Sequence, residues 1–242
     1  MLSEKPWNPE GVLIFLLGVF GSMILGMFLL GGLQWAELVP GPQSKLVSIL
    51  IGTLSFHGAS LILIVPFLRR HQLTWSEAFG FRSPKLARAL TWGFLSSIGA
   101  LPVAWLLGKL SSQLLTSYKI DVSLQMQVQL LVEKPTIAVQ VAVALITVFL
   151  APVAEELFFR GILYPAVKRM AHPQIALWGS SFLFACMHNN VMLFVPLLFL
   201  GMVLALLYEA TDNLLAPILA HSLFNSANLA LLLLFPQSVQ SP

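Results

Sequence analysis

Long uninterrupted apolar stretches dominate the first half of the chain. Residues 11–33 carry no charged side chain, residues 46–68 contain His57 as their only titratable group, and residues 89–108 are again uncharged. A helix needs about 20 apolar residues to cross a hydrocarbon core roughly 30 Å thick. Each of the three stretches therefore predicts one membrane-spanning helix.

The second half of the chain continues this pattern. A fourth span is expected to begin near Thr136. The longest uncharged stretch, residues 170–208, exceeds one helix, and Asn189-Asn190 near its middle is a turn signal, so it predicts two short spans. Residues 213–235 predict the last span.

These segments predict an all-α, polytopic transmembrane bundle of seven to eight helices, built as a single integral membrane domain over residues 1–242. The apolar runs are continuous, whereas barrel strands alternate over about ten residues. Residues 111–135 fit either a strand or a helix lying in the membrane interface. The first 30 residues are expected to remain as an uncleaved anchor, because their apolar run is too long for a signal peptide.

Composition supports a membrane protein and excludes several other classes. Hydrophobic residues make up 57% of the chain and charged residues 10%, against about 45–50% and about 25% in soluble domains. A soluble domain or a disordered chain is therefore excluded. No basic tract suggests a nucleic-acid partner. Because the composition is so apolar, membrane lipid is the expected surrounding. The single cysteine, Cys186, cannot form an internal disulfide.

The placement of lysine and arginine predicts the orientation, because cytoplasmic loops carry an excess of both. With the N-terminus in the cytoplasm, eight basic residues fall inside and four outside. The eight are Lys5, Arg69, Arg70, Arg82, Lys85, Arg88, Lys168 and Arg169, and the four are Lys45, Lys109, Lys119 and Lys134. We therefore expect a plasma (inner) membrane protein with a cytoplasmic N-terminus.

Three charged residues interrupt the apolar fourth span. An ionisable group at membrane depth costs at least ~2.5–3.5 kcal/mol on insertion scales, so it marks a candidate functional site. Glu156 and Arg160 are spaced i, i+4 with the acid first, which favours an ion pair. Glu155 is then free to face another neighbour. The structural alternative is a helix end at the interface with two solvated acids.

Histidine and asparagine residues occur at comparable depth in the later spans. His188 follows an apolar run, and His221 and Asn225 lie on one face of the last predicted helix. Such side chains serve equally well as hydrogen-bonding contacts between helices or as catalytic groups. His57 and His172 are interpreted as structural residues.

A carboxylate, two imidazoles and a carboxamide, without a suitably placed serine, cysteine or aspartate nucleophile, indicate chemistry with activated water. Glu155 could act as general base, while His221 and Asn225 could donate hydrogen bonds to an oxyanion. The set Glu155, His188 and His221 could instead bind Zn²⁺ with a position open for water. The sequence leaves both alternatives open, although the usual H-E-x-x-H arrangement is absent.

Three short motifs occur in the order found in a known family. They are Glu155-Glu156-x-x-x-Arg160, Phe184-x-x-x-His188 and His221-x-x-x-Asn225. In this order they resemble the motifs of the CAAX-protease and bacteriocin-processing (CPBP, or Abi) family, relatives of the Ras-converting prenyl-protein endopeptidase. The resemblance covers about residues 136–235.

The resemblance implies an intramembrane endopeptidase with its catalytic core in residues 136–235 and a chamber opening toward the cytoplasm. It assigns roles to the motif residues: Glu155 as catalytic base, His188 as a group positioning the water, His221 and Asn225 as oxyanion donors, and Glu156 and Arg160 as supports of the helix geometry.

Cofactor, substrate and alternatives follow from the same resemblance. The family has been described both as metalloproteases and as metal-independent glutamate proteases. We expect no required cofactor, with Zn²⁺ bound by Glu155, His188 and His221 as the alternative. The expected partner is a peptide or lipidated peptide, such as a prenylated CAAX peptide, and no nucleic acid. The competing hypothesis is a non-catalytic membrane protein of the bacteriocin-immunity or scaffolding type.

Overall fold

The computed structural model describes residues 2–39, 43–81, 86–120, 124–133 and 135–235. All regular structure within these ranges is helical. The all-α prediction is therefore confirmed.

The first two spans are long helices. Helix α1 (Pro9–Trp35) begins at Asn8, whose side chain accepts a hydrogen bond from the backbone N–H of Gly11. The second span is continuous but changes its helix type. It consists of α2 (Gln43–Thr53), the π-helical segment η1 (Leu54–Gly58) and α3 (Ala59–Arg70).

One short helix precedes the third span and another precedes the fourth. The short helices are α4 (Trp75–Phe79) and α6 (Met126–Val132). The third span is α5 (Leu86–Ser117). The fourth is a continuous series of α7 (Ile137–Leu145), η2 (Ile146–Leu150), α8 (Ala151–Glu156), η3 (Leu157–Leu163) and α9 (Tyr164–Met170). The last three are α10 (Pro173–Met187), α11 (Phe194–Thr211) and α12 (Leu215–Leu234).

The number and positions of the spans agree with the apolar pattern. Within the described residues, six helical stretches are long and apolar enough to cross a membrane, and α10, with 15 residues, is shorter than these. The break predicted at Asn189-Asn190 separates α10 from α11. Of the segment 111–135, the first part extends α5 to Ser117 and residues 126–132 form α6, so its described part contains helix and no strand. Residues 121–123 and 134 lie outside the described residues.

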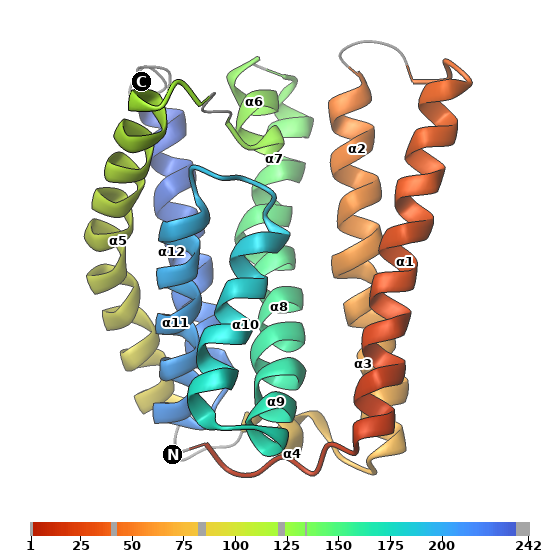
Figure 1. Ribbon diagram of the computed structural model, residues 1–242, viewed down its shortest axis with the longest axis vertical. Helices are drawn as coiled ribbons and strands as arrows, with labels where there is room; N and C mark the ends of the chain where they lie inside the picture. The colour runs from red at the N-terminus through yellow and green to blue at the C-terminus, as the bar shows by residue number, and fades with distance from the viewer. Residues whose placement is uncertain (1, 40–42, 82–85, 121–123, 134, 236–242) are drawn as a thin grey trace.

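Successive spans alternate in direction along the bundle (Figure 1). The N-terminus, α4 and α9 lie at one end, called here the N-terminal end, and α6 lies at the other, called the α6 end. Helices α5, α10, α11 and α12 pack together, and α1 packs with the second span. The fourth span contacts both groups, because α8 touches α12 and η1.

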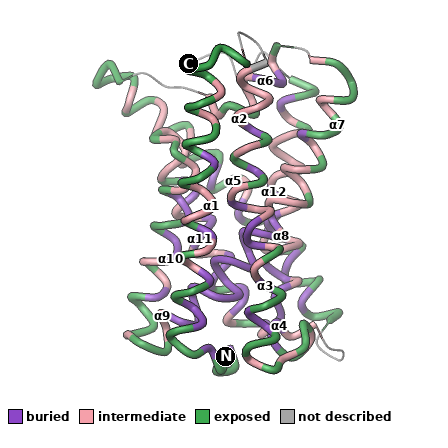
Figure 2. Tube along the Cα trace, turned by 90° about the vertical axis from the view of Figure 1, so that its right-hand side faces the viewer, coloured by how far each residue is buried: buried purple, intermediate pink, exposed green. Residues whose placement is uncertain are grey.

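The N-terminal end is closed by a segment that we call the N-terminal clamp (residues 2–8). The Trp7 side chain is buried, and its Nε1 donates to the Gly161 carbonyl at 3.0 Å. Arg169 Nη1 donates to the Trp7 carbonyl at 3.1 Å, and Lys5 Nζ lies 3.3 Å from Asp212 Oδ1. Figure 2 shows that buried residues concentrate in this half of the bundle, whereas the α6 half is more exposed.

Candidate active site

The functional side chains lie next to three π-helical segments in the middle of the bundle. Segment η1 carries His57, η2 contains Thr147, and η3 begins directly after Glu156. A π turn inserts one residue and re-aims the side chains around it, and such turns are frequent at functional sites. The non-ideal helix geometry therefore coincides with the motif residues.

Three imidazoles surround the carboxylate of Glu155, a side chain with only 7% of its residue surface exposed. Its Oε1 lies 3.0 Å from Nε2 of His57. Its Oε2 lies 3.8 Å from Nε2 of His188 and 3.9 Å from Nε2 of His221. Oε2 is buried and has no hydrogen-bond partner among the described residues.

The second acid of the pair holds His221 in place. Oε1 of Glu156 accepts from Arg160 Nη1 at 2.8 Å, as the i, i+4 spacing predicts, and lies 2.9 Å from Nδ1 of His221. Arg160 also donates from Nη2 to the Gly201 carbonyl at 2.9 Å, and its guanidinium lies 4.6 Å from the ring centre of Phe184. Glu156 is 0% exposed and Arg160 is 1% exposed. The two residues thus form a buried ion pair that holds the neighbouring His221 in position.

The hydrogen bonds that Nδ1 donates determine what the two motif histidines present to Glu155. His188 Nδ1 lies 2.7 Å from the Phe184 carbonyl, which can only accept, so Nδ1 carries a hydrogen. The same assignment holds for Nδ1 of His221 against the Glu156 carboxylate. In the neutral state both rings therefore direct an Nε2 lone pair toward Oε2 of Glu155. Oε2 of Glu155 and the two Nε2 atoms are then three hydrogen-bond acceptors that face one another. A ligand that contacts them has to donate hydrogen bonds.

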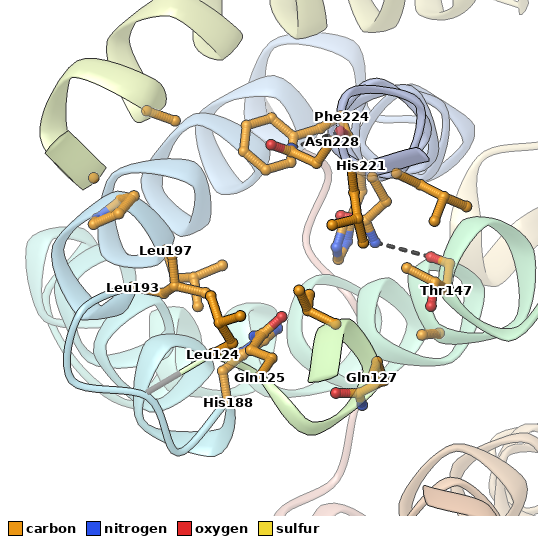
Figure 3. Close-up of a pocket in the computed structure, with 18 of the residues that line it drawn as sticks. Leu124, Gln125, Gln127, Thr147, His188, Leu193, Leu197, His221, Phe224 and Asn228 are labelled. Atoms are coloured by element: carbon orange, nitrogen blue, oxygen red, sulfur yellow. Dashed lines mark hydrogen bonds between the residues drawn. The ribbon is translucent and has the colours of Figure 1, made fainter. Parts of the chain in front are cut away.

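These side chains line one cavity of about 410 Å³. His57, Glu155, His188, His221 and Asn225 are among its polar groups, as are Gln125 and Gln127, while α5, α6, α11 and α12 supply mainly apolar walls. In Figure 3, His188 and His221 face this cavity from two sides. The prediction that Glu155, His188, His221 and Asn225 surround one cavity therefore agrees with the structure.

The two asparagines of α12 make different contacts. Asn225 uses one amide hydrogen, donating from Nδ2 to the Thr147 carbonyl at 2.9 Å, and retains the second (Figure 3). Asn228 accepts from Trp105 Nε1 at 2.9 Å and donates to the Phe224 carbonyl at 2.8 Å. Asn228 therefore joins α12 to α5, whereas Asn225 keeps a donor for a ligand.

The structural interpretation of His57 did not anticipate its contact with the candidate site. His57 lies in the second span, 98 positions before Glu155 in the chain, yet it makes the direct contact with that carboxylate. An ionisable side chain alone in an otherwise apolar span was the sequence signal that could have found it. The same interpretation is correct for His172, whose side chain caps α10 by accepting from the backbone N–H of Gln174.

The cavity extends from the middle of the bundle toward one of its ends. Its lining includes Gly108 near the end of α5 and several residues of α6, so it extends toward the α6 end. The chain's N-terminus lies at the opposite end. The cavity and the N-terminus therefore lie toward opposite ends of the bundle, and the cytoplasmic N-terminus and cytoplasmic opening stay predictions.

The residue types suit zinc, but their spacing does not. Ligand atoms at 2.0–2.2 Å from a tetrahedral zinc ion lie roughly 3.3–3.6 Å apart, whereas Oε2 of Glu155 is 3.8 and 3.9 Å from the two Nε2 atoms. Within the described residues, no group of three or more histidine, cysteine, aspartate or glutamate side chains is arranged to hold a metal ion.

Comparison with known proteins confirms the resemblance carried by the three motifs. Residues 137–227 match the family described as Rce1-like, type II CAAX prenyl endopeptidase. The uncharacterized protein YpbD of Bacillus subtilis (strain 168) is 34% identical over 77 residues, which are 30% of this chain and 36% of that protein. The chain thus matches about a third of the length of this relative. No solved structure matches. At the level of the family, the match supports a CAAX-type intramembrane protease, and with the apolar helices it indicates an integral membrane protein.

Proposed function

We propose that this chain, whose residues 137–227 match the Rce1-like family, is an intramembrane endopeptidase that hydrolyses a peptide bond with water activated by Glu155. One observation carries the proposal. Oε2 of Glu155 and Nε2 of His188 and His221 converge within 3.9 Å on a cavity large enough for a peptide segment. A water molecule between these acceptors can donate to two of them, which orients its oxygen lone pairs toward a bound carbonyl.

The proposed reaction uses the chain's own side chains. Glu155 removes a proton from the water as its oxygen forms a bond to the substrate carbonyl carbon. The second Nδ2 hydrogen of Asn225 stabilises the oxyanion. His221 is the second donor once its Nε2 has taken a proton from solvent, with the Glu156 carboxylate neutralising the charge, and the water then donates to Glu155 and His188. Glu155 then passes the proton to the leaving nitrogen as the carbon–nitrogen bond breaks. His188 keeps the water in position.

The proposed reaction needs no cofactor. The partners of the enzyme are membrane lipid and a peptide or lipidated peptide. The basic residues favour a plasma (inner) membrane location with the N-terminus in the cytoplasm.

The test of Glu155 is the variant Glu155→Gln, purified in detergent and assayed with a library of quenched fluorescent apolar peptides. We expect cleavage to fall by about 10²–10⁴-fold, because the general base is lost. The matched control is Glu10→Gln, which changes an exposed acid at the start of α1. Undiminished cleavage by folded Glu155→Gln protein would remove Glu155 from the mechanism.

Two further outcomes distinguish the alternatives. Activity is expected to survive a zinc chelator, and elemental analysis is expected to find no stoichiometric metal. A stoichiometric zinc ion whose removal abolishes cleavage would replace the mechanism above. A wild-type protein that binds library peptides but cleaves none would indicate the non-catalytic immunity or scaffolding type.

A further inference from the structure

The N-terminal clamp runs across one end of the bundle before α1 begins (Figure 1). Its tryptophan, Trp7, is 2% exposed and packs against side chains from two other elements. The centre of the Trp7 ring lies 5.0 Å from that of Phe67 in the second span and 6.4 Å from that of Phe79 in α4. A residue far outside the family-matched residues 137–227 therefore belongs to the packed interior of this end.

Trp7 hydrogen-bonds to a carbonyl for which the fourth span cannot supply the usual α-helical donor. In an α-helix, the carbonyl of residue 161 accepts from the backbone N–H of residue 165. Residue 165 is Pro165, which has no N–H. The Nε1–H of Trp7 donates to the buried Gly161 carbonyl at 3.0 Å. Because a buried carbonyl without a donor is costly, the clamp stabilises this turn from outside the helix.

The turn that Trp7 contacts is connected to the candidate active site by hydrogen bonds. Gly161 directly follows Arg160 in the π-helical segment η3. Arg160 donates to Oε1 of Glu156 at 2.8 Å, and the same oxygen lies 2.9 Å from Nδ1 of His221. A displacement of the Gly161 turn therefore moves the ion pair that holds the His221 ring.

The clamp also joins the two elements whose side chains meet in the site. At one end of the clamp, the Trp7 carbonyl accepts from Nη1 of Arg169 in α9, at 3.1 Å. Near the other end, Lys5 Nζ lies 3.3 Å from Oδ1 of Asp212, in the loop that leads into α12. The fourth span carries the two motif acids, and α12 carries the second motif histidine. The clamp thus bridges the two sides of the site at a distance from the cavity.

We infer that Trp7 is a positioning residue for the proposed reaction, acting through the Gly161 carbonyl on the buried ion pair and on His221. The effect on the rate of cleavage rests on the proposed peptidase function. The effect on the packing of the motif acids rests on the fold alone.

The variant Trp7→Phe in the full chain, purified in detergent, tests this role, because it keeps an aromatic ring and removes the Nε1 donor. We expect kcat for the fluorescent peptides to fall about three- to tenfold, the contribution of one neutral hydrogen bond. The KM is expected to change less than twofold, since Trp7 is not among the described residues that line the cavity. Both constants are measured well below the melting temperature of each variant.

The matched control is Trp75→Phe, the same substitution at the same end of the bundle. Trp75 also packs on Phe79, with ring centres 5.7 Å apart, but it is 40% exposed. Its replacement should leave kcat and KM unchanged. A wild-type kcat in Trp7→Phe, a change confined to KM, or equal losses of kcat in the two variants would overturn the inference.

A second measurement monitors the motif acids without any cleavage. An apolar carbodiimide modifies protonated carboxyl groups that it can reach, and peptide mass spectrometry locates the modified residues. We expect Glu155 or Glu156 to be modified at least threefold faster in Trp7→Phe than in wild type, and at the wild-type rate in Trp75→Phe. Unchanged modification in Trp7→Phe overturns the inferred route through the ion pair. If the wild type cleaves no peptide, the proposed function fails, while the modification rates still decide whether Trp7 holds the motif acids in place.

Discussion

At the residue scale, one oxygen of Glu156 contacts two partners that the chain supplies from different helices. Arg160 and His221 both lie within 2.9 Å of Oε1, and all three side chains are buried. Removing one partner of a buried ion pair leaves an uncompensated charge, which costs more than the pair itself contributes. The arrangement therefore depends on all three residues being present.

Arg160→Met is expected to destabilise the protein by about 3–5 kcal/mol, because it leaves the Glu156 carboxylate buried with His221 alone. The measurement is thermal unfolding in detergent. The matched control is Arg70→Met, which breaks the exposed pair with Glu10 at 2.7 Å and should cost less than about 1 kcal/mol. Similar losses in both variants would contradict a supporting role for Arg160.

His57 is expected to position the carboxylate of Glu155. His57→Leu should lower kcat by about 10- to 100-fold, because a hydrogen bond to a charged group contributes about 1.5–3 kcal/mol. His57→Gln retains an N–H donor and should recover part of the activity. A control, His172→Asn, changes the α10 cap and should leave kcat unchanged. If the leucine and glutamine variants lose the same activity, the hydrogen bond is not the reason for the effect.

Local spacing was sufficient for some of these contacts and insufficient for others. The Glu156–Arg160 pair could be predicted because i, i+4 positions are neighbours on any helix. The contact of His57 with Glu155 could not, because it depends on how two spans pack and no periodicity within one span encodes it. The hydrogen bond from Asn225 to Thr147 has the same origin.

At the element scale, α5 and α12 pack with their backbones close together. A Cβ atom added at Gly93 would lie 2.7 Å from the Ala216 carbonyl oxygen, which is too close for any side chain. The absence of a side chain at Gly93 therefore lets α12, which carries His221 and Asn225, approach α5.

Gly93→Ala is expected to destabilise the protein by about 1–3 kcal/mol, because the two helices must separate to accept the methyl group. Gly99→Ala on the same helix is the matched control, since a Cβ there meets nothing within 4 Å. Thermal unfolding of the two variants checks this expectation. Equal stability would show that the helices separate without cost.

Span positions were predictable from apolar length, whereas their ends were not. The third span was predicted over 89–108 and extends over Leu86–Ser117. The additional residues include Lys109, Ser111 and Gln113, which continue the helix past the apolar stretch. Hydropathy locates the part of a helix that lies in hydrocarbon, and polar residues beyond it remain helical without contributing to that signal.

At the scale of the whole molecule, the N-terminal clamp joins the start of the chain to the loop between α11 and α12. Asp212 in that loop accepts hydrogen bonds from the backbone and side chain of Ser3 and lies beside Lys5. Partial burial favours the neutral carboxyl, but these contacts outweigh it and hold the pKa of Asp212 below its ordinary value. The clamp is therefore linked to pH.

The sign of this linkage follows from the lowered pKa. In the unfolded chain Asp212 binds its proton near pH 4, while in the folded protein it stays ionised to lower pH. Its contribution to stability is present above about pH 4 and is lost as the pH falls through the folded pKa. We expect the melting temperature of wild type to fall more steeply below pH 4 than that of Asp212→Asn. Ser3→Ala should reduce the slope in part, and identical slopes in all three proteins would contradict the linkage.

The end of the bundle toward which the cavity extends is a global property that sequence reasoning could not predict. The basic residues and the motif order are both visible in the chain, but which end of the bundle is filled by side chains depends on where the N-terminal clamp and α4 pack. That packing joins segments more than 150 positions apart, beyond the reach of any local pattern.

Asn225 has one further consequence for how this protein could evolve. One of its amide hydrogens is committed to the Thr147 carbonyl, inside the π-helical segment η2. Replacement by aspartate would preserve the side-chain shape but supply no hydrogen to either Thr147 or a ligand. Substitution of Asn225 is thus limited both by its contact with the neighbouring helix and by the proposed reaction. A related protein without hydrolase activity would still need the amide for the contact with Thr147.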